Sequence, residues 1–405
     1  GTEYFVNFSV TTVEPEPLIP AGYEIAYDQF QLPIQAEKRI YKANGPALTT
    51  ATSGDELTVS SSKVNFVFNK KSGLVTSYKV DGTEYFKDGF GIQPNFWRAP
   101  NDNDYGNGAP KRLQVWKQSS KNFHVTDVKM TTENKVVSLK ATYLLAAGNL
   151  YVVTYRIYPS GIVNVSAQFT STDMQAAETE VSEATRMATF TPGSDAARKA
   201  ASKLEVPRIG VRFRLPAQMN NVQYFGRGPE ENYIDRNHGT LVGVYKTTAD
   251  KMYFNYVRPQ ENGHHTDTRW IALSPDKGNG LAIVADSLIG FNALRNSIED
   301  FDSEEALPHP YQWNNFSPEE VANHDEKAAR NVLRRMHHVN DITPRDFVEV
   351  CVDMKQQGVG GYDSWGARPE PFHQIPANRD YSWGFTLVPV RSASQANEVA
   401  KYDYQ

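Results

Sequence analysis

Val137-Ser-Leu-Lys-Ala-Thr-Tyr143, Tyr151-Val-Val-Thr-Tyr-Arg-Ile157 and Val163-Asn-Val-Ser-Ala-Gln-Phe169 follow one another along the chain. In each segment every second residue is apolar, which is the pattern of a β-strand with one buried face. The same alternation returns in shorter segments, at 64–68, 74–80, 209–215, 222–224 and 270–273. No helical segments alternate with these strands. The sequence therefore predicts an all-β fold, a large antiparallel sandwich, rather than layers of alternating strand and helix.

The composition is that of an ordinary globular protein with many aromatic residues. Of the 405 residues, 40% are hydrophobic, 22% are charged and 12% are aromatic, with 21 Tyr. The net charge is −5 and no stripe of Lys and Arg stands out, so nucleic acid and an anionic membrane are not indicated as partners. No apolar run approaches the ~18 residues of a membrane span, and the single Cys351 is expected to be buried.

The chain divides into three expected parts. Residues 1–36 contain strands joined by Pro-rich turns and are interpreted as the remnant of a small sandwich whose other strands lie upstream. Residues 37–56 are rich in Ala, Thr, Ser and Gly and are predicted to be a linker, and residues 57–405 form the large domain. Within it, 172–205 is predicted to be a long surface loop and Ser317-Pro-Glu-Glu320 to begin a short helix.

One aromatic residue lies where the sequence offers little to cover it. The alternating segment Phe347–Met354 leads into Gly358-Val-Gly-Gly-Tyr-Asp-Ser-Trp365-Gly366, so Trp365 is expected at the tip of a loop. An exposed indole can cover the C–H face of a sugar ring while the hydroxyl groups of the sugar remain free for hydrogen bonds. The alternative is that Trp365 caps the edge of the core, and the local pattern leaves both open.

Three polar loops follow strands and are candidates for a binding site. They are 96–106, with Arg98, Asp102 and Asn103; 225–236, with Arg227, Glu230 and Asn232; and 256–265, with Arg258 and Glu261. Polar clusters at strand ends beside glycines are common places for sites in sandwich proteins. The Asn/Asp run 101–104 fits a turn scaffold, hydroxyl recognition or a metal, but it lacks the spacing of a calcium loop. His264, His265 and Asp267 match no zinc pattern.

Taken together, five ordered motifs resemble the C-terminal domain of the large β-galactosidases of glycoside hydrolase family 2. The motifs are Arg98–Asp104, Pro207–Gly210, Gly226–Arg236, Pro259–Gly263 and Gly358–Trp365. The first ~35 residues are similar to the end of the immunoglobulin-like domain that precedes it. The resemblance implies a β-supersandwich of the galactose mutarotase type. It also implies a soluble bacterial protein of the cytoplasm or periplasm. Whether the parent protein is a homo-oligomer is left open.

The resemblance also implies a role for the loop residues. Trp365 is expected to reach the active site of a catalytic barrel and to stack on the galactoside. The expected substrate-binding set comprises Trp365, Asp363, Arg98, Asp102, Asn103, Arg227, Glu230, Asn232, Arg258 and Glu261. The family draws its two catalytic Glu residues and its magnesium and sodium ligands from the barrel, and no motif here resembles those around the Glu pair. The chain is therefore expected to have no catalytic residue, to bind no metal or cofactor of its own, and to be hydrolytically silent alone.

Three functions remain open from the sequence. The first is the non-catalytic part of a retaining β-galactosidase, with the rest of the parent chain as partner. The second is a free-standing aldose mutarotase, in which Glu230, Glu261, His264 or His265 serve as acid and base. The third is a carbohydrate-binding module without chemistry.

Overall fold

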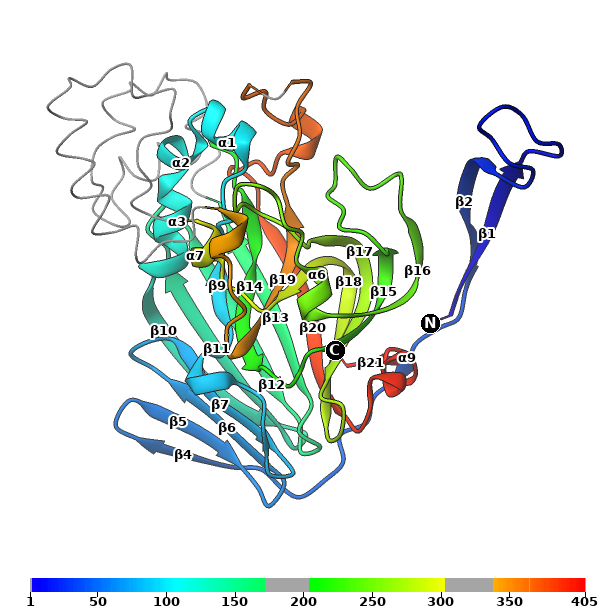
Figure 1. Ribbon diagram of the computed structural model, residues 1–405. Helices are drawn as coiled ribbons and strands as arrows, with labels where there is room; N and C mark the ends of the chain where they lie inside the picture. The colour runs from blue at the N-terminus through cyan, green and yellow to red at the C-terminus, as the bar shows by residue number, and fades with distance from the viewer. Residues whose placement is uncertain (1, 172–203, 303–337, 364, 405) are drawn as a thin grey trace, which may run out of the picture.

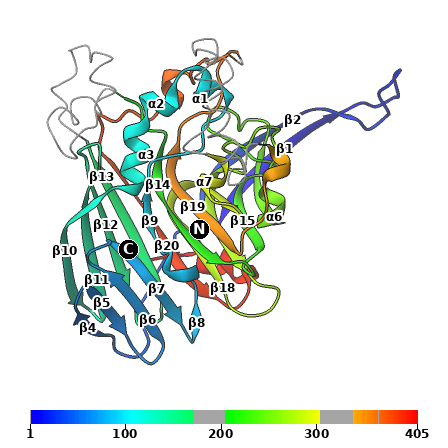
Figure 2. The same ribbon diagram turned by 60° about the vertical axis from the view of Figure 1, so that its left-hand side comes forward.

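The computed structural model describes residues 2–171, 204–302, 338–363 and 365–404, and Figures 1 and 2 show their arrangement. Strands dominate, and almost all of them pair antiparallel. The prediction of a large antiparallel β fold is therefore confirmed. The predicted helix at 317–327 lies outside the described residues, as does nearly all of the predicted loop 172–205.

The largest sheet carries most of the core. Its main path runs in the order β10-β11-β12-β13-β20-β18-β17-β15-β16, while β14 joins β9 to β19, which pairs with β18. The strands of this sheet are β9 (Gln93–Asn95), β10 (His124–Glu133), β11 (Val136–Leu144), β12 (Leu150–Ile157), β13 (Val163–Thr170), β14 (Arg208–Pro216), β15 (Asn221–Gly228), β16 (Leu241–Thr248), β17 (His265–Ser274), β18 (Gly280–Leu294), β19 (Phe347–Gln356) and β20 (Tyr381–Val390).

The three alternating segments form β11, β12 and β13, as the sequence predicts. Tyr143 lies opposite Tyr151, and Ile157 lies opposite Val163. Their alternate residues are buried because a second sheet covers that face. This second sheet consists of β4 (Thr49–Ser53), β5 (Glu56–Ser60), β6 (Val64–Asn69), β7 (Leu74–Val80) and β8 (Thr83–Glu84). Phe66 and Phe68 pack on Tyr155, with ring centroids 5.7 and 6.1 Å apart, so the two sheets form a sandwich.

Residues 37–56, predicted to be a linker, contain regular structure. β4 pairs along its whole length with β5, and β3 (Arg39–Ile40) pairs in parallel with β21 (Tyr402–Asp403) near the end of the chain. The segment Thr49-Thr-Ala-Thr-Ser53 shows no alternation because all five of its side chains are exposed. The extended linker that composition suggested is therefore limited to short stretches between these strands.

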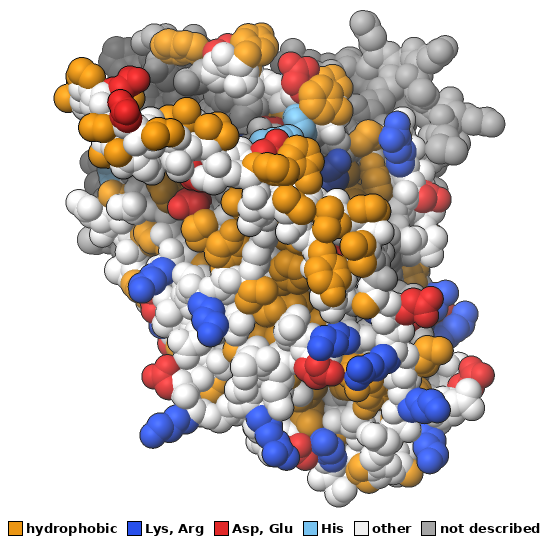
Figure 3. Space-filling model, turned by 90° about the vertical axis from the view of Figure 1, so that its right-hand side faces the viewer, with side chains coloured by type: hydrophobic (Ala, Val, Ile, Leu, Met, Phe, Trp, Pro, Cys, Tyr) orange, Lys and Arg blue, Asp and Glu red, His pale blue; other side chains and the backbone are white. Residues whose placement is uncertain are grey.

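The first strands form a hairpin that projects from the body of the molecule (Figures 1 and 2). β1 (Glu3–Thr11) and β2 (Glu24–Gln35) pair only with each other. Large apolar side chains on both strands are exposed, including Phe8 (55%) and Phe30 (54%). Seen from the side of this hairpin, hydrophobic side chains gather in the centre and upper part of the molecule, and Lys and Arg gather in the lower half (Figure 3). The division at residue 36 into two domains stays a prediction.

Short helices that the sequence analysis missed connect β9 to β10. They are α1 (Asp102–Gly106), α2 (Ala109–Arg112) and α3 (Gln114–Lys121). Trp116 of α3 is fully buried and packs on Phe96 and Phe169. Other short helices are α6 (Ala249–Met252), α7 (Ile298–Phe301), α9 (Ala396–Val399), η1 (Lys87–Gly89), η3 (Val339–Asp341), η4 (Pro371–His373) and η5 (Ala393–Gln395). In the described part of the chain no helix has the length and apolar character needed to cross a membrane.

Candidate functional site

Among the residues of the large domain that the structure describes, the connection between β19 and β20 presents the most exposed aromatic rings. It lies beside α1 at one end of the sheet (Figures 1 and 2). Within it the side chains of Tyr362, Trp365 and Phe372 are 90%, 77% and 71% exposed. Of the two interpretations of Trp365, the cap of a core edge is therefore wrong for this chain, because the indole is open to solvent.

The start of this connection is fixed to two other loops. Asp235 accepts hydrogen bonds from the N–H groups of Val359 (3.1 Å) and Gly360 (2.9 Å). Asn101 Nδ2 donates to the carbonyl of Val359 at 2.7 Å. A Cβ atom at Gly358 would lie 2.3 Å from Asp235 Oδ2, so this close approach requires glycine. Asp235 was not among the predicted site residues, although it lies in the quoted motif Gly226–Arg236.

The backbone around Trp365 is held by Asp363 and by α1. Asp363 Oδ1 accepts from the N–H of Trp365 (2.9 Å) and of Ala367 (3.0 Å), and these hydrogen bonds hold the pKa of the carboxyl below its ordinary value. Asn103 Nδ2 donates to the carbonyl of Asp363 at 2.9 Å. A Cβ atom at Gly106 would meet the carbonyl oxygen of Trp365 at 2.3 Å. The predicted residues Asp363 and Asn103 thus fix the loop tip through contacts within the protein.

Arg98 is buried beneath this surface. Its guanidinium binds the Asp104 carboxylate through two nitrogens, at 3.0 and 3.2 Å, and donates to the Gln357 carbonyl at 2.7 Å. Asp104 in turn completes the capping box of α1 with Asn101. Only 2% of Arg98 is exposed, so in this structure it connects α1 to the start of the Trp365 connection.

Arg258 and Asp102 lie on the outer side of α1. The Arg258 guanidinium is 3.7 Å from the centroid of the Tyr105 ring and 3.1 Å from Asp102 Oδ1. Both side chains are partly open to solvent. The structure therefore brings six of the predicted residues into one group around α1: Arg98, Asp102, Asn103, Arg258, Asp363 and Trp365.

The other four predicted residues do not join this group directly. Asn232 is fully buried and binds the carbonyls of Arg227 and Glu230 and the N–H of Thr266. Arg227 pairs with Asp267 and donates to the Thr240 carbonyl at 2.8 Å. Glu230 is exposed beside them. These contacts shape the 229–236 loop, which reaches the Trp365 connection through Asp235.

Glu261 belongs to a buried charged cluster, which we define as Arg208, Glu261, His264, Asp353 and Gln356. Arg208 lies 3.1 Å from Glu261, 3.3 Å from Asp353, and hydrogen bonds to Gln356. His264 Nδ1 is 3.7 Å from Asp353. Burial raises the pKa of Glu261 and lowers that of His264, since both are removed from water. Of this cluster, the sequence analysis named only Glu261 and His264 as candidate functional residues. Arg208 and Asp353 lie on segments whose apolar alternation indicates buried strands.

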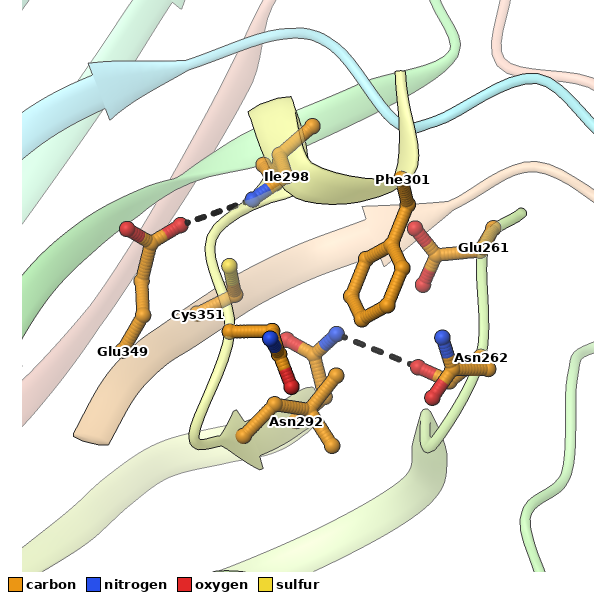
Figure 4. Close-up of a pocket in the computed structure, with 9 residues that line it drawn as sticks. Glu261, Asn262, Asn292, Ile298, Phe301, Glu349 and Cys351 are labelled. Carbon is orange, nitrogen blue, oxygen red and sulfur yellow. Dashed lines mark hydrogen bonds between the residues drawn. The ribbon is translucent and has the colours of Figure 1, made fainter. Parts of the chain in front are cut away.

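A small cavity lies beside this cluster (Figure 4). Glu261, Asn262, Asn292, Phe301 and Cys351 are among its lining residues. Its volume is about 10 Å³, which is room for about one water molecule and far too little for a sugar ring. Burial raises the pKa of the Cys351 thiol well above its ordinary value, so Cys351 is an inert core residue as expected.

The stability of the chain should depend on pH through Asp353. Burial raises the pKa of its carboxyl from 3.8 to about 7. Between these values the folded chain binds a proton that the unfolded chain does not bind. The contribution of Asp353 is therefore fully present below about pH 4 and is lost as the pH rises through about 7. We expect the free energy of unfolding of the unmodified protein, relative to Asp353→Asn, to fall between about pH 4 and about pH 7 in urea titrations. A constant difference would contradict this.

Asp235 should act as a positioning residue for the Trp365 connection. Asp235→Ala removes the acceptor of two N–H groups, and hydrogen bonds to a charged group each contribute about 1.5–3 kcal/mol. We expect hydrogen exchange of the peptide containing residues 357–363 to become at least about 5-fold faster. Asp235→Asn, which keeps one acceptor, should restore part of the protection, and Asp276→Ala, at an exposed carboxylate elsewhere, should leave it unchanged. Equal protection in Asp235→Ala would remove the positioning role.

Comparisons with known proteins agree with the resemblance noted in the sequence. The sequence model of the beta galactosidase small chain matches residues 60–387, and the chain belongs to this family. The β-galactosidase of Priestia megaterium is 32% identical over 391 residues, covering 96% of this chain and 32% of that protein. The β-galactosidase of Streptococcus thermophilus is 25% identical, covering 92% of this chain and 30% of that protein. The chain thus spans about a third of the length of these relatives.

Among solved structures, the chain is similar to galactose 1-epimerase from Lactobacillus acidophilus. The TM-score is 0.41 and the sequence identity is 8%, with 86% of this chain and 98% of that chain covered.

Proposed function

We propose that this chain is the sugar-facing, non-catalytic part of a retaining β-galactosidase. In this proposal Trp365 forms one wall of a pocket whose catalytic carboxylates lie elsewhere in the parent protein, and a terminal β-galactoside is the substrate. The observation that carries the proposal is the 77% exposure of an indole whose backbone N–H binds Asp363 and whose carbonyl packs closely against Gly106. An exposed, fixed aromatic face suits the C–H face of galactose. Because the indole is uncharged, binding an uncharged sugar does not remove a charged group from water.

The residues around Trp365 support a positioning role rather than chemistry. The three carboxylates of the group around α1 are occupied: Asp363 by backbone N–H groups, Asp102 by Arg258 and Asp104 by Arg98. A retaining glycosidase needs two carboxyl groups about 5 to 5.5 Å apart and open to the substrate. No such open pair is built by these three residues, which is why the proposal places the reaction on the parent protein.

The parent protein is also the proposed partner of the β1–β2 hairpin. Tyr4, Val6, Phe8 and Val10 share one face of β1, and all four are exposed. A two-stranded sheet with an open apolar face is marginal in water, and further strands would bury that face. The hairpin is held to the large domain by Tyr27, which donates to the Gly239 carbonyl at 2.7 Å, and by Gln29, which bonds to Val242.

Magnesium and sodium are implied for the parent by the resemblance, and we propose that residues of the parent outside this chain bind both ions. In the described residues, no group of three or more His, Cys, Asp or Glu side chains has the arrangement needed to hold a metal. No step of the proposal depends on either ion.

The experiment is to measure lactose hydrolysis by this chain alone and by the full-length protein. We expect turnover only in the full-length protein, because the catalytic pair is supplied by the parent. Polarimetry with fresh α-galactose should show no acceleration by the chain, since Glu261, His264 and His265 are buried and the cavity that Glu261 lines holds about one water molecule. Hydrolysis by the chain, or mutarotation abolished by Glu261→Gln, would contradict the proposal.

A further inference from the structure

A second hollow lies at the end of the molecule away from Trp365. It is formed where β7 and the end of β20 meet the C-terminal segment that carries α9 and β21, whereas α1 and the Trp365 connection lie at the top of Figure 1. Its volume is about 520 Å³. This is within the range of roughly 300–1,000 Å³ typical of small-molecule sites and about fifty times the volume of the cavity beside Glu261. We call it the tyrosine groove.

One wall of the groove is aromatic and firmly held. Tyr41, Tyr402 and Tyr404 line it, with ring centroids between 5.1 and 6.3 Å apart. The parallel pairing of β3 with β21 fixes Tyr41 and Tyr402, and Tyr158 donates to the Tyr404 carbonyl at 2.6 Å. The floor is apolar and includes Val80, Ile162 and Val390, all of them buried. Strand pairing and packing therefore hold this wall and floor in place.

The rim of the groove is polar and its charges cancel. Lys63 and Arg391 contribute two positive charges, while Asp81 and Glu398 contribute two negative ones. Lys63 lies 3.5 Å from Asp81, and Glu398 pairs with Arg39 and Lys401. The Arg391 guanidinium makes no ion pair with any residue in the described ranges. A balanced rim of donors and acceptors favours an uncharged ligand with many hydroxyl groups over a phosphate or an amine.

The shape of the aromatic wall narrows the ligand class further. The Tyr41 ring is inclined by 86° to Tyr402 and by 41° to Tyr404, so no two parallel rings form a slot for a flat base. A corner of inclined rings with an apolar floor suits the puckered C–H face of a pyranose. We propose that the tyrosine groove is a second saccharide site, which binds an uncharged oligosaccharide of two or three rings independently of Trp365.

The test uses the full-length protein with Trp365→Ala, in which the first site is weakened, and disaccharides that are not β-galactosides. Saturation-transfer-difference NMR with sucrose, maltose or cellobiose, each at about 10 mM, should show binding of at least one disaccharide with a Kd on the order of 1 mM. Adding Tyr402→Ala should weaken this binding at least about 5-fold, because one face of the corner is lost. Arg391→Ala should weaken it at least about 2-fold. Because the Arg391 side chain is exposed, this variant is expected to fold normally.

The control is Leu288→Ala, which removes an exposed apolar side chain of β18 outside the groove and should leave binding unchanged. Circular dichroism checks that each variant is folded, and if Tyr402→Ala is not, the Arg391→Ala result decides. Absence of a signal with all three disaccharides would overturn the second site. Unchanged binding in the folded groove variants would overturn it too, as would binding of a proline-rich peptide in place of the sugars. None of these outcomes depends on the rate of lactose hydrolysis.

Discussion

Replacing Trp365 by alanine in the full-length protein is expected to raise the KM for lactose about 10-fold. Covering apolar surface contributes about 25 cal/mol per Å², and aromatic contact about 0.5–1.5 kcal/mol beyond that, so the loss of one sugar-covering face corresponds to about tenfold in affinity. The value of kcat should change less than KM, since the contact is present in the bound substrate and in the transition state alike. Steady-state kinetics with lactose measure both constants.

Two further variants make this result specific. Trp365→Phe keeps a flat aromatic face and should recover part of the affinity. Leu288→Ala, at an exposed apolar side chain of β18, should leave KM unchanged. A KM for Trp365→Ala equal to that of the unmodified enzyme would remove the platform role.

Replacing Arg208 by alanine is expected to lower the free energy of unfolding by about 3–5 kcal/mol. The change leaves Glu261 and Asp353 without their shared cation in a site that water does not reach, and breaking a buried ion pair on one side has this magnitude. Urea unfolding at about pH 8, above the pKa of Asp353, followed by circular dichroism measures the loss. Arg39→Ala is the matched control, because Arg39 and Glu398 form an exposed pair at 3.6 Å and such pairs contribute about 0–1 kcal/mol. A loss below about 1 kcal/mol in Arg208→Ala would mean that the carboxyls are neutral and need no cation.

The strands of the sandwich could be predicted because one face of each is buried. The segments around Val137, Tyr151 and Val163 alternate since the small sheet covers every second side chain. β4 could not be found in this way, because none of its side chains is buried and its residues are small and polar. The helices after β9 were missed for another reason. Asn101 and Asp104 read as turn residues, yet they cap α1 reciprocally.

The site could be predicted in part. The glycines around Trp365 indicated an exposed tip, and the structure shows one. Charged residues in polar loops were all interpreted as ligand-facing, but Arg98 and Glu261 are buried. Both are buried because each pairs with an oppositely charged residue. The partner of Arg98, Asp104, is close in sequence, whereas the partner of Glu261, Arg208, is 53 residues away. Such distant pairing leaves no local trace, and neither does the bond of Asp235 to Val359, 124 residues away.

The two points at which the Trp365 connection joins the sheet determine how far the connection can be altered without disturbing the fold. β19 and β20 both pair with β18, through Gly290–Leu294 and Gly280–Ala285 respectively, so both ends of the connection are attached to one strand. Loop closure becomes less favourable by only about 0.6 kcal/mol for each doubling of length when the ends are fixed. Exchanges at exposed positions of the connection should therefore be tolerated by the scaffold, whereas Ile375 and Ala377 near its end are buried in the core. That makes Tyr362 and Phe372, both exposed, the natural positions to vary if the proposed sugar contact of Trp365 is to be redesigned.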